Sequence, residues 1–517
     1  MDEPGPGRVS RQSIAAAIVI FVSFFVFAAV RAPVPGVNEP HYLSKAKHYW
    51  NPDWCSGDLF LESSNPHRFF YQAVGWPTLW LSLEQTAWLG RWLALGVLAL
   101  GWTALGHRLL HDKWAVMCSA WIYLLLAAIG NLSGEWIVGG VESKVFAFGL
   151  LLLGGALALD GAWNRAAIAS GLAIAFHPLV GVWGVVAASI ATLPAIVRRS
   201  GTQDKRVRTH WTRNWRPLLL LLLCALPGLL PALSVVGNGS AAADRVQVFE
   251  RLSHHLDPMT FRAFGYIWYG LLIVCWLVAG RFGGNDGKLR TFDRFVWASL
   301  LIAAVGFIAG FGPRPPEQMP LFEFRMTLLK FYPFRLFDAV LPIAVALTLT
   351  NAVRGRPAGA STSFRRRLVW CVAALGLLAS LVLPAVDRNP SRMSPHQLSD
   401  WIDACRWIES ETSRDALIVT PRESWAFKWY AQRAEYFSYK DCPQDAPALL
   451  EWTARRVFLG SWIHPPSGRS YSIRDLRVLH TKSAATFLMT ADNNRLPIVP
   501  AYRNDSFAVY RLEAESQ

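Results

Sequence analysis

The chain has 517 residues, of which 53% are hydrophobic and only 17% are charged, and its mean hydropathy is +0.25. Soluble domains carry about 25% charged residues, so this composition excludes a disordered chain, a collagen, a coiled coil and a disulfide scaffold. The net charge of +15 does not indicate nucleic-acid binding, because the basic residues cluster between apolar runs as in membrane proteins. The composition therefore predicts a polytopic membrane protein surrounded by lipid.

Apolar runs long enough to form helices recur along the first three quarters of the chain. A helix that crosses a membrane needs about 20 apolar residues. The first run follows Arg8 and Arg11 and precedes no convincing cleavage site, which predicts an uncleaved helix with a cytoplasmic N-terminus. The runs, eleven in all, lie near 13–30, 86–106, 114–130, 145–160, 166–176, 181–197, 217–236, 266–280, 295–312, 337–352 and 368–386.

The apolar stretch 166–197 decides the topology. His177-Pro178 lies inside it, and proline ends a helix and disfavours helical backbone at the residue before it. Two short helices also keep the basic loop 198–216 on the cytoplasmic side, where Lys and Arg are enriched. The sequence thus predicts about 11 spans in the cell (inner) membrane, with the C-terminus on the extracytoplasmic face.

Residues 387–517 contain no run long enough to span a membrane, and short strands alternate with helices there. This pattern predicts a small extracytoplasmic α/β domain after a transmembrane domain, 1–386, whose first outer loop, 32–85, is long. Cys405 and Cys442 could form a disulfide there or remain free thiols. The expected strands are 416–420, 434–439, 486–490 and 506–511, and the expected helices are 403–410, 425–432 and 445–456.

The long loop 32–85 is rich in Trp, Tyr, His and carboxylates, and loops of this length often carry function. Glu39 lies shortly after the first span, where a partly buried carboxylate could act as a general base. The alternative is structural, with Asn38 capping a helix and Glu39 favouring its N-terminal dipole. His41 and Tyr42 are polar candidates beside it.

Two glutamates stand among glycines and apolar residues in the second outer loop. Ionisable groups near the membrane are costly and are usually paired or functional. Glu142 could pair with Lys144 or Arg335, and Glu135 and Glu142 are also candidates for supporting acidic groups in an active site.

Two further outer segments carry charges in aromatic surroundings. His254, His255 and Asp257 could bind a divalent metal, although no further ligand follows at fixed spacing, so no cofactor is certain. Arginine binds phosphate through two parallel hydrogen bonds, and cations at this interface could instead reach ordinary lipid headgroups. The phosphate-binding candidates are Arg262, Lys330 and Arg335.

Taken together, an acidic residue in a long outer loop after the first span, many spans and a C-terminal outer α/β domain resemble the GT-C superfamily of membrane glycosyltransferases. Glu39 matches the place where that superfamily carries a catalytic Asp or Glu. The acidic pair common in many members is replaced here by Asn38-Glu39. The blocks 38–42, 139–144, 177–178 and 334–338 also resemble uncharacterised bacterial multi-pass proteins related to that group.

The resemblance implies a cell-envelope hexosyltransferase that moves a sugar, with inversion, from a polyprenyl-phosphate donor to an extracytoplasmic acceptor. It implies that Glu39 is the general base and that Arg335, Lys330 or Arg262 stabilises charge on the phosphate. A transporter or flippase of a lipid-linked glycan is a second hypothesis, although the chain shows no internal repeat. A non-catalytic scaffold of the same architecture and an oligosaccharide ligase or polymerase are further alternatives.

Overall fold

The computed structural model describes residues 11–200, 215–283, 286–354, 362–422, 424–463, 471–491 and 496–512, so most of the basic loop 198–216 lies outside the described residues. The chain divides into two units. The helical unit contains Met1–Arg31, Arg91–Ala232 and Asp244–Ala385, and the mixed unit contains Ala32–Gly90, Leu233–Ala243 and Val386–Gln517. The long first loop and the C-terminal segment therefore belong to one unit.

Every apolar run expected from the sequence forms a helix. These helices are α1 (Arg11–Arg31), α5 (Leu83–Leu110), α6 (Lys113–Ile129), α7 (Ser143–Leu159), α8 (Trp163–Phe176), α9 (Pro178–Ser200), α11 (Arg216–Gly237), α14 (Ala263–Phe282), α15 (Gly287–Gly310), α17 (Arg335–Arg354) and α18 (Thr362–Val382). As predicted, α8 ends before His177 and α9 begins at Pro178.

Shorter helices connect these long ones. They are α12 (Ala241–Arg245), η2 (Val246–Arg251), α13 (Ser253–Leu256), η3 (Pro258–Thr260), η4 (Pro316–Gln318) and α16 (Phe322–Lys330).

The described helices fit a multi-pass membrane protein. Among the residues that the structure describes, six helices are long and apolar enough to cross a membrane, namely α1, α5, α11, α14, α15 and α17. Shorter apolar helices lie within α6, α7, α9 and α18. The predicted number of about 11 spans stays a prediction, because several of the helices are short for a crossing.

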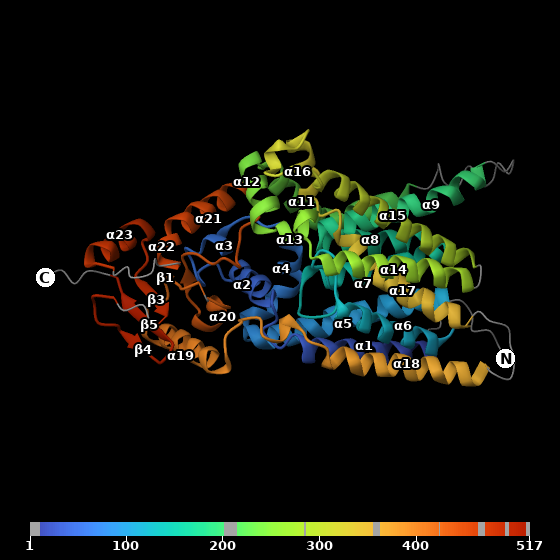
Figure 1. Cartoon of the computed structure of the whole chain (residues 1–517), viewed down its shortest axis with the longest axis horizontal. Coiled ribbons are helices and arrows are strands. Elements are labelled where there is room, and N and C mark those ends of the chain that lie inside the picture. Colours follow the sequence, from blue (N-terminus) through green and yellow to red (C-terminus); the bar gives the residue numbers. More distant parts are fainter. Residues whose placement is uncertain are drawn as a thin grey trace. The chain divides into compact units, whose positions relative to one another are not determined.

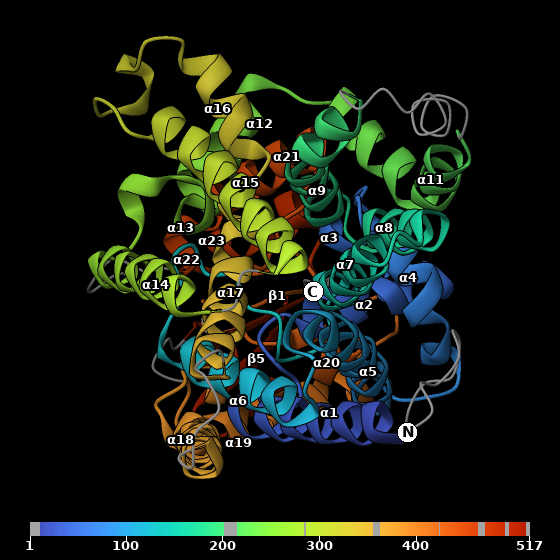
Figure 2. The same ribbon diagram turned by 90° about the vertical axis from the view of Figure 1, so that its right-hand side faces the viewer.

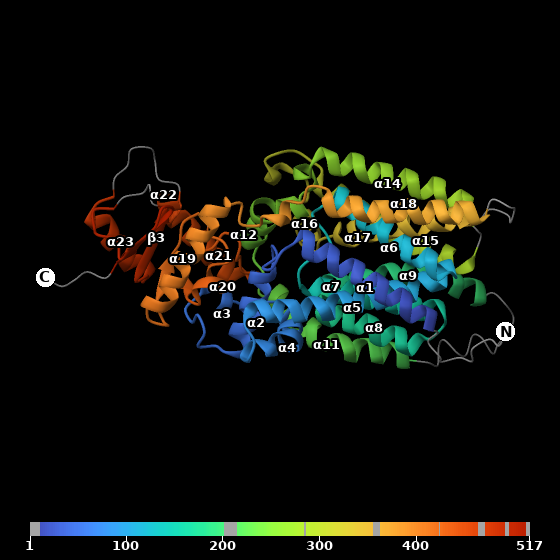
Figure 3. The same cartoon turned by 90° about the horizontal axis from the view of Figure 1, so that it is seen from below.

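Burial identifies the centre of the helical unit. The most apolar window of α17 is 83% buried, whereas that of α11 is only 17% buried. Figure 2 shows α17 among α6, α14 and α15, and it packs against all three. Figure 3 shows α1, α6 and α18 side by side, and Arg31 at the end of α1 donates to the carbonyls of Ser380 (2.7 Å) and Leu383 (2.8 Å) near the end of α18. These bonds satisfy carbonyls that a helix leaves unpaired at its C-terminus.

Glycines permit a close contact between helices α5 and α7. A Cβ added at Gly101 of α5 would lie 2.2 Å from the carbonyl oxygen of Gly149 in α7, and one added at Gly149 would lie 2.8 Å from the backbone nitrogen of Leu98. Small residues allow membrane helices to approach closely. Such packing is important for their association, because lipid offers no hydrophobic driving force between helices.

The mixed unit combines helices with a five-stranded sheet (Figure 1). The strand order is β2 (Ala434–Glu435), β1 (Leu417–Val419), β3 (Phe487–Ala491), β5 (Phe507–Arg511) and β4 (Tyr502–Arg503). β1 is parallel to β2 and β3, whereas β5 is antiparallel to β3 and β4. The helices are α2 (Glu39–Trp50), α3 (Leu59–Glu62), α4 (Arg68–Gly75), η1 (Trp76–Leu79), η5 (Val386–Arg388), α19 (Pro395–Glu411), α20 (Phe427–Ala431), α21 (Ala446–Phe458), α22 (Gly460–Ile463) and α23 (Ile473–Ser483).

Each expected C-terminal strand and helix overlaps an observed one. The first four residues of both β3 and β5 are buried, and helix α19 packs on the sheet around Trp401, which is fully buried. Cys405 is buried and Cys442 is partly buried, and both are free thiols. The structure adds β4, α22 and α23, which the sequence pattern did not predict.

The glycine contact yields a stability prediction. Gly101→Ala should destabilise the protein by about 1–3 kcal/mol, because the new methyl group would overlap the Gly149 carbonyl and the helices would have to move apart. Gly96→Ala is the matched control on the same helix, since a Cβ there meets no atom within 4 Å. Thermal unfolding in detergent should show a lower midpoint for Gly101→Ala alone, and equal midpoints would contradict the importance of this contact.

Candidate functional site

The first candidate, Glu39, is the first residue of α2 and is fully buried. Its Oε2 accepts a hydrogen bond of 2.6 Å from the backbone N–H of Gly36, so one oxygen of the carboxylate has a fixed direction. The helix begins at Glu39, and Pro40 suits its first turn. Glu39 therefore lies at a helix N-terminus, as the structural alternative expected, and is also a buried carboxylate, as a general base would be.

Residues from the C-terminal part of the chain hold this turn of α2. Asn38 occupies the N-cap position without a side-chain capping bond, and its Oδ1 instead accepts a 2.5 Å bond from Lys440 Nζ. His41 Nδ1 lies 3.0 Å from Asp441 Oδ1. Burial lowers the pKa of His41 even though Asp441 opposes that shift. The Tyr42 ring packs near the rings of His67 and Phe70, so Tyr42 forms part of an aromatic core.

A buried ammonium joins three carboxylates behind this turn. Lys428 Nζ lies 2.7 Å from Asp441 Oδ2, 3.2 Å from Asp58 Oδ2 and 3.3 Å from Glu435 Oε2. The side chain of Lys428 is only 3% exposed, and burial by itself would lower its pKa, but the three carboxylates raise the pKa well above its ordinary value. We call these four side chains the Lys428 network.

A second buried lysine anchors the loop that follows α2. Lys45 Nζ donates to the carbonyl oxygens of Phe60 and Ser63, with 2.6 Å to the latter, and to Ser63 Oγ at 2.8 Å. Burial lowers its pKa to about 7, although nearby carboxylates raise it. Lys45 thus ties α2 to α3 in the mixed unit.

The helical unit contains its own buried charge cluster. Lys144 Nζ lies 2.9 Å from Glu135 Oε1 and 3.3 Å from Glu142 Oε2, and Arg335 Nε lies 2.7 Å from Glu135 Oε2. Arg335 Nη1 also lies 3.0 Å from His177 Nε2. Of the two partners expected for Glu142, Lys144 forms an ion pair with it, and Arg335 pairs with Glu135.

Asp338, which the sequence did not assign to a site, organises the loop before this cluster. Its carboxylate accepts hydrogen bonds from the backbone N–H groups of Leu132 (2.8 Å), Ser133 (2.8 Å) and Glu135 (2.9 Å), and from Ser133 Oγ (2.9 Å). Its main-chain oxygen accepts from the Tyr269 hydroxyl at 2.5 Å. Asp338 therefore fixes the position of the Glu135 backbone relative to α17.

The remaining cationic candidates differ in exposure. Lys330 forms an ion pair with Asp244, and the Arg335 guanidinium is paired with Glu135. Arg262 is exposed at the N-cap position of α14. Of the three residues expected to contact phosphate, Arg262 is thus the most accessible.

The His-His-x-Asp motif is used for separate contacts. His255 Nδ1 contacts the carbonyl oxygen of Ser133, and burial lowers the pKa of His255 well below its ordinary range. Asp257 caps η3 and forms a 2.6 Å ion pair with Arg314, and the His254 ring lies beside His255. Within the described ranges, no group of three or more His, Cys, Asp or Glu side chains has an arrangement that could hold a metal ion.

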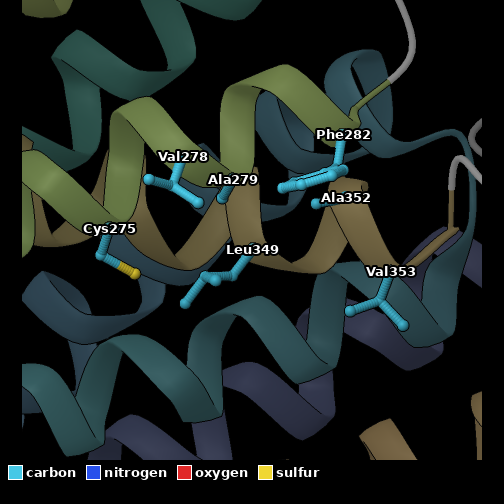
Figure 4. Close-up of a pocket in the computed structure, with 7 residues that line it drawn as sticks. All are labelled: Cys275, Val278, Ala279, Phe282, Leu349, Ala352 and Val353. Atoms are coloured by element: carbon cyan, nitrogen blue, oxygen red, sulfur yellow. The ribbon is translucent and has the colours of Figure 1, made fainter.

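An apolar groove of about 360 Å³ lies between α14 and α17 (Figure 4). It contains no acid or base that could act on a substrate, so its chemistry suits a hydrocarbon chain rather than catalysis. The residues that line it are Cys275, Val278, Ala279, Phe282, Leu349, Ala352 and Val353.

Sequence reasoning missed the residues of the C-terminal segment that reach the first loop. Lys428, Glu435 and Asp441 follow no motif, and Asp58 is far from them in sequence. The one available signal is compositional, because a lysine between apolar and aromatic residues at Phe427–Ala431 requires a charged partner if it is buried.

Comparisons with known proteins identify the fold. A family model described as a domain of unknown function, DUF6798, matches residues 399–457, and no curated protein matches significantly. The crystal structure of ArnT from Cupriavidus metallidurans bound to undecaprenyl phosphate is similar at 13% identity and a TM-score of 0.50, covering 97% of this chain and 98% of that chain. An oligosaccharyltransferase structure from Archaeoglobus fulgidus, in complex with zinc and sulfate, has 13% identity and a TM-score of 0.39, covering 92% of this chain and 68% of that chain.

The likeness to ArnT, which extends over nearly the whole of both chains, shows that this chain shares the fold of that structure, as its resemblance to GT-C proteins led us to expect. This confirms the resemblance and the fold class expected from the sequence. The matched family model covers Lys428, Glu435 and Asp441, so it includes three of the four residues of the Lys428 network.

The buried cluster of the helical unit yields a second prediction. Lys144→Met should destabilise the protein by about 3–5 kcal/mol, because Glu135 and Glu142 would lose the cation that compensates their buried charge. Lys288→Met is the control, since Lys288 pairs with Asp160 at the surface and exposed pairs contribute about 1 kcal/mol or less. Thermal unfolding in detergent should separate the two variants, and equal midpoints would show that the cluster does not stabilise the fold.

Proposed function

We propose that this protein is a membrane glycosyltransferase that transfers a sugar from a polyprenyl-phosphate donor to an acceptor on the extracytoplasmic face, with Glu39 as the general base. The observation that carries the proposal is the position of Glu39, a fully buried carboxylate in the first turn of α2, just after the first apolar helix. The GT-C fold supports the reaction type. The ArnT structure with bound undecaprenyl phosphate supports the donor class.

The proposed chemistry is an inverting displacement. Glu39 accepts the proton of an acceptor hydroxyl, whose oxygen attacks the anomeric carbon of the donor sugar. The bond from that carbon to the phosphate oxygen breaks with its electron pair, and polyprenyl phosphate leaves as an anion.

The leaving phosphate needs positive charge that is arranged in advance. Arg262 is exposed and stands at the N-terminus of α14, where backbone N–H groups also favour an anion. Arg335 and Lys330 already compensate carboxylates, so they would have to share their charge with the phosphate. We therefore rank Arg262 first among the three phosphate candidates.

The proposed topology follows from the positive-inside rule. The basic segments between helices lie on the cytoplasmic side of the inner membrane, and the mixed unit lies on the extracytoplasmic face. That face is where a flipped lipid-linked sugar donor is available to the enzyme.

The test is sugar transfer by the full chain in nanodiscs, offered a mixture of polyprenyl-phosphate hexoses. Wild type should release polyprenyl phosphate, and Glu39→Gln should release it at least 100-fold more slowly, because loss of a general base typically costs 10²–10⁴-fold. Glu62→Gln is the matched control, since Glu62 lies in the same loop, also accepts a backbone N–H, and is exposed.

Each result has a distinct meaning. Equal rates for wild type and a folded Glu39→Gln would remove Glu39 as the base. An absence of release by wild type with every donor would reject the proposed reaction and favour the transporter or scaffold hypothesis.

A further inference from the structure

Two consecutive residues, Lys440 and Asp441, contact the helix turn that carries Glu39. Lys440 Nζ donates to Asn38 Oδ1, one residue before Glu39, and Asp441 Oδ1 lies 3.0 Å from His41 Nδ1, two residues after it. One turn of an α-helix contains 3.6 residues, so both contacts fall on the same turn. We call this pair of contacts the 440–441 clamp.

The clamp rests on a fixed support. The second oxygen of Asp441 lies 2.7 Å from Lys428 Nζ, which also binds Asp58 and Glu435. Glu435 in turn accepts hydrogen bonds of 2.5 Å each from the hydroxyls of Thr420 and Ser424. Because Lys428, Glu435 and Asp441 each contact two or more polar groups, the position of Asp441 is determined by the whole network.

The clamp also explains why Asn38 does not cap its own helix. An N-cap asparagine ordinarily accepts a hydrogen bond from a backbone N–H of the first turn, which stabilises the helix. Here its oxygen accepts from Lys440, and the structure shows no side-chain capping bond. Asn38, the residue before Glu39, thus forms a hydrogen bond with the distant Lys440 in place of a side-chain capping bond within its own helix.

We propose that Lys440 and Asp441 are positioning residues for Glu39, fixing its carboxylate through Asn38 and His41. This inference rests on the proposed function, in which Glu39 is the base. It assigns a role to part of the segment matched by the DUF6798 family model, since that segment supplies both clamp residues. Catalysis is sensitive to such support, because a displacement of about 1 Å can cost 100-fold in rate.

The test compares three variants of the full chain in nanodiscs. Lys440→Met removes the donor to Asn38 and keeps the length of the side chain, and Lys440→Arg restores a cationic donor. Lys482→Met is the control, since Lys482 is an exposed cation of the same unit that contacts the Phe458 ring. For release of polyprenyl phosphate from a polyprenyl-phosphate hexose, Lys440→Met should lower kcat by about 10–100-fold and leave KM for the donor nearly unchanged, with rescue by Lys440→Arg.

A double-mutant cycle identifies the route of the effect. If Lys440 acts through Asn38, Lys440→Met should cost little further activity in an Asn38→Ala background. Full additivity would mean that Lys440 does not act through Asn38 and would overturn this part of the clamp. Asp441→Asn provides the second arm, because it removes the charge shared with Lys428 and should lower kcat in the same way.

Hydrogen exchange gives a readout that does not depend on activity. The backbone amides of 36–42 should exchange faster in Lys440→Met and Asp441→Asn than in wild type, and unchanged exchange would overturn the clamp. If Glu39→Gln abolishes release and the clamp variants keep full kcat, the positioning role fails alone. If wild type releases no polyprenyl phosphate, the proposed function fails, and with it the catalytic meaning of the clamp.

Discussion

The ammonium of Lys428 is the charge on which the mixed unit depends. Taking an ammonium out of water costs several kcal/mol unless carboxylates and hydrogen bonds compensate it closely. Here Asp58 does so from the first loop, and Glu435 and Asp441 do so from the C-terminal segment. A compensated buried charge adds little net stability, but it strongly disfavours arrangements in which any partner is missing. The network therefore mainly determines which conformation the first loop adopts beside the sheet.

The helical unit applies the same rule with different residues. Glu135 is shared by Lys144 and Arg335, and the Asp338 carboxylate accepts backbone donors from the loop that carries Glu135. The two clusters lie in loops or at helix ends. Charged groups in a membrane protein cost less there than in the middle of an apolar helix. In both, a loop that sequence pattern would leave undefined is held by charges from a distant helix or strand.

The fold was largely predictable because its signals are local. Hydropathy identified the helices, His177-Pro178 marked the boundary between α8 and α9, and runs such as Phe487–Ala491 indicated strands. The site was less predictable because its contacts are not local. Glu39 could be singled out by its position in the sequence. The contacts that hold its turn join Asn38 to Lys440 and His41 to Asp441, about 400 positions away. A single sequence carries no signal for such pairs, since neither partner changes the local pattern.

The mixed unit is discontinuous in the chain, because its two largest segments are Ala32–Gly90 and Val386–Gln517. During synthesis the first of these segments emerges long before the second. At about 5–20 residues per second, the nearly 300 intervening residues impose a delay of roughly 15–60 s. Throughout that interval Asp58 and the turn of α2 exist without the strand and lysine that complete them. The turn that carries Glu39 therefore acquires its final surroundings only after the C-terminal segment has been made, so a chain interrupted before that segment would have its apolar helices and an unfinished first loop.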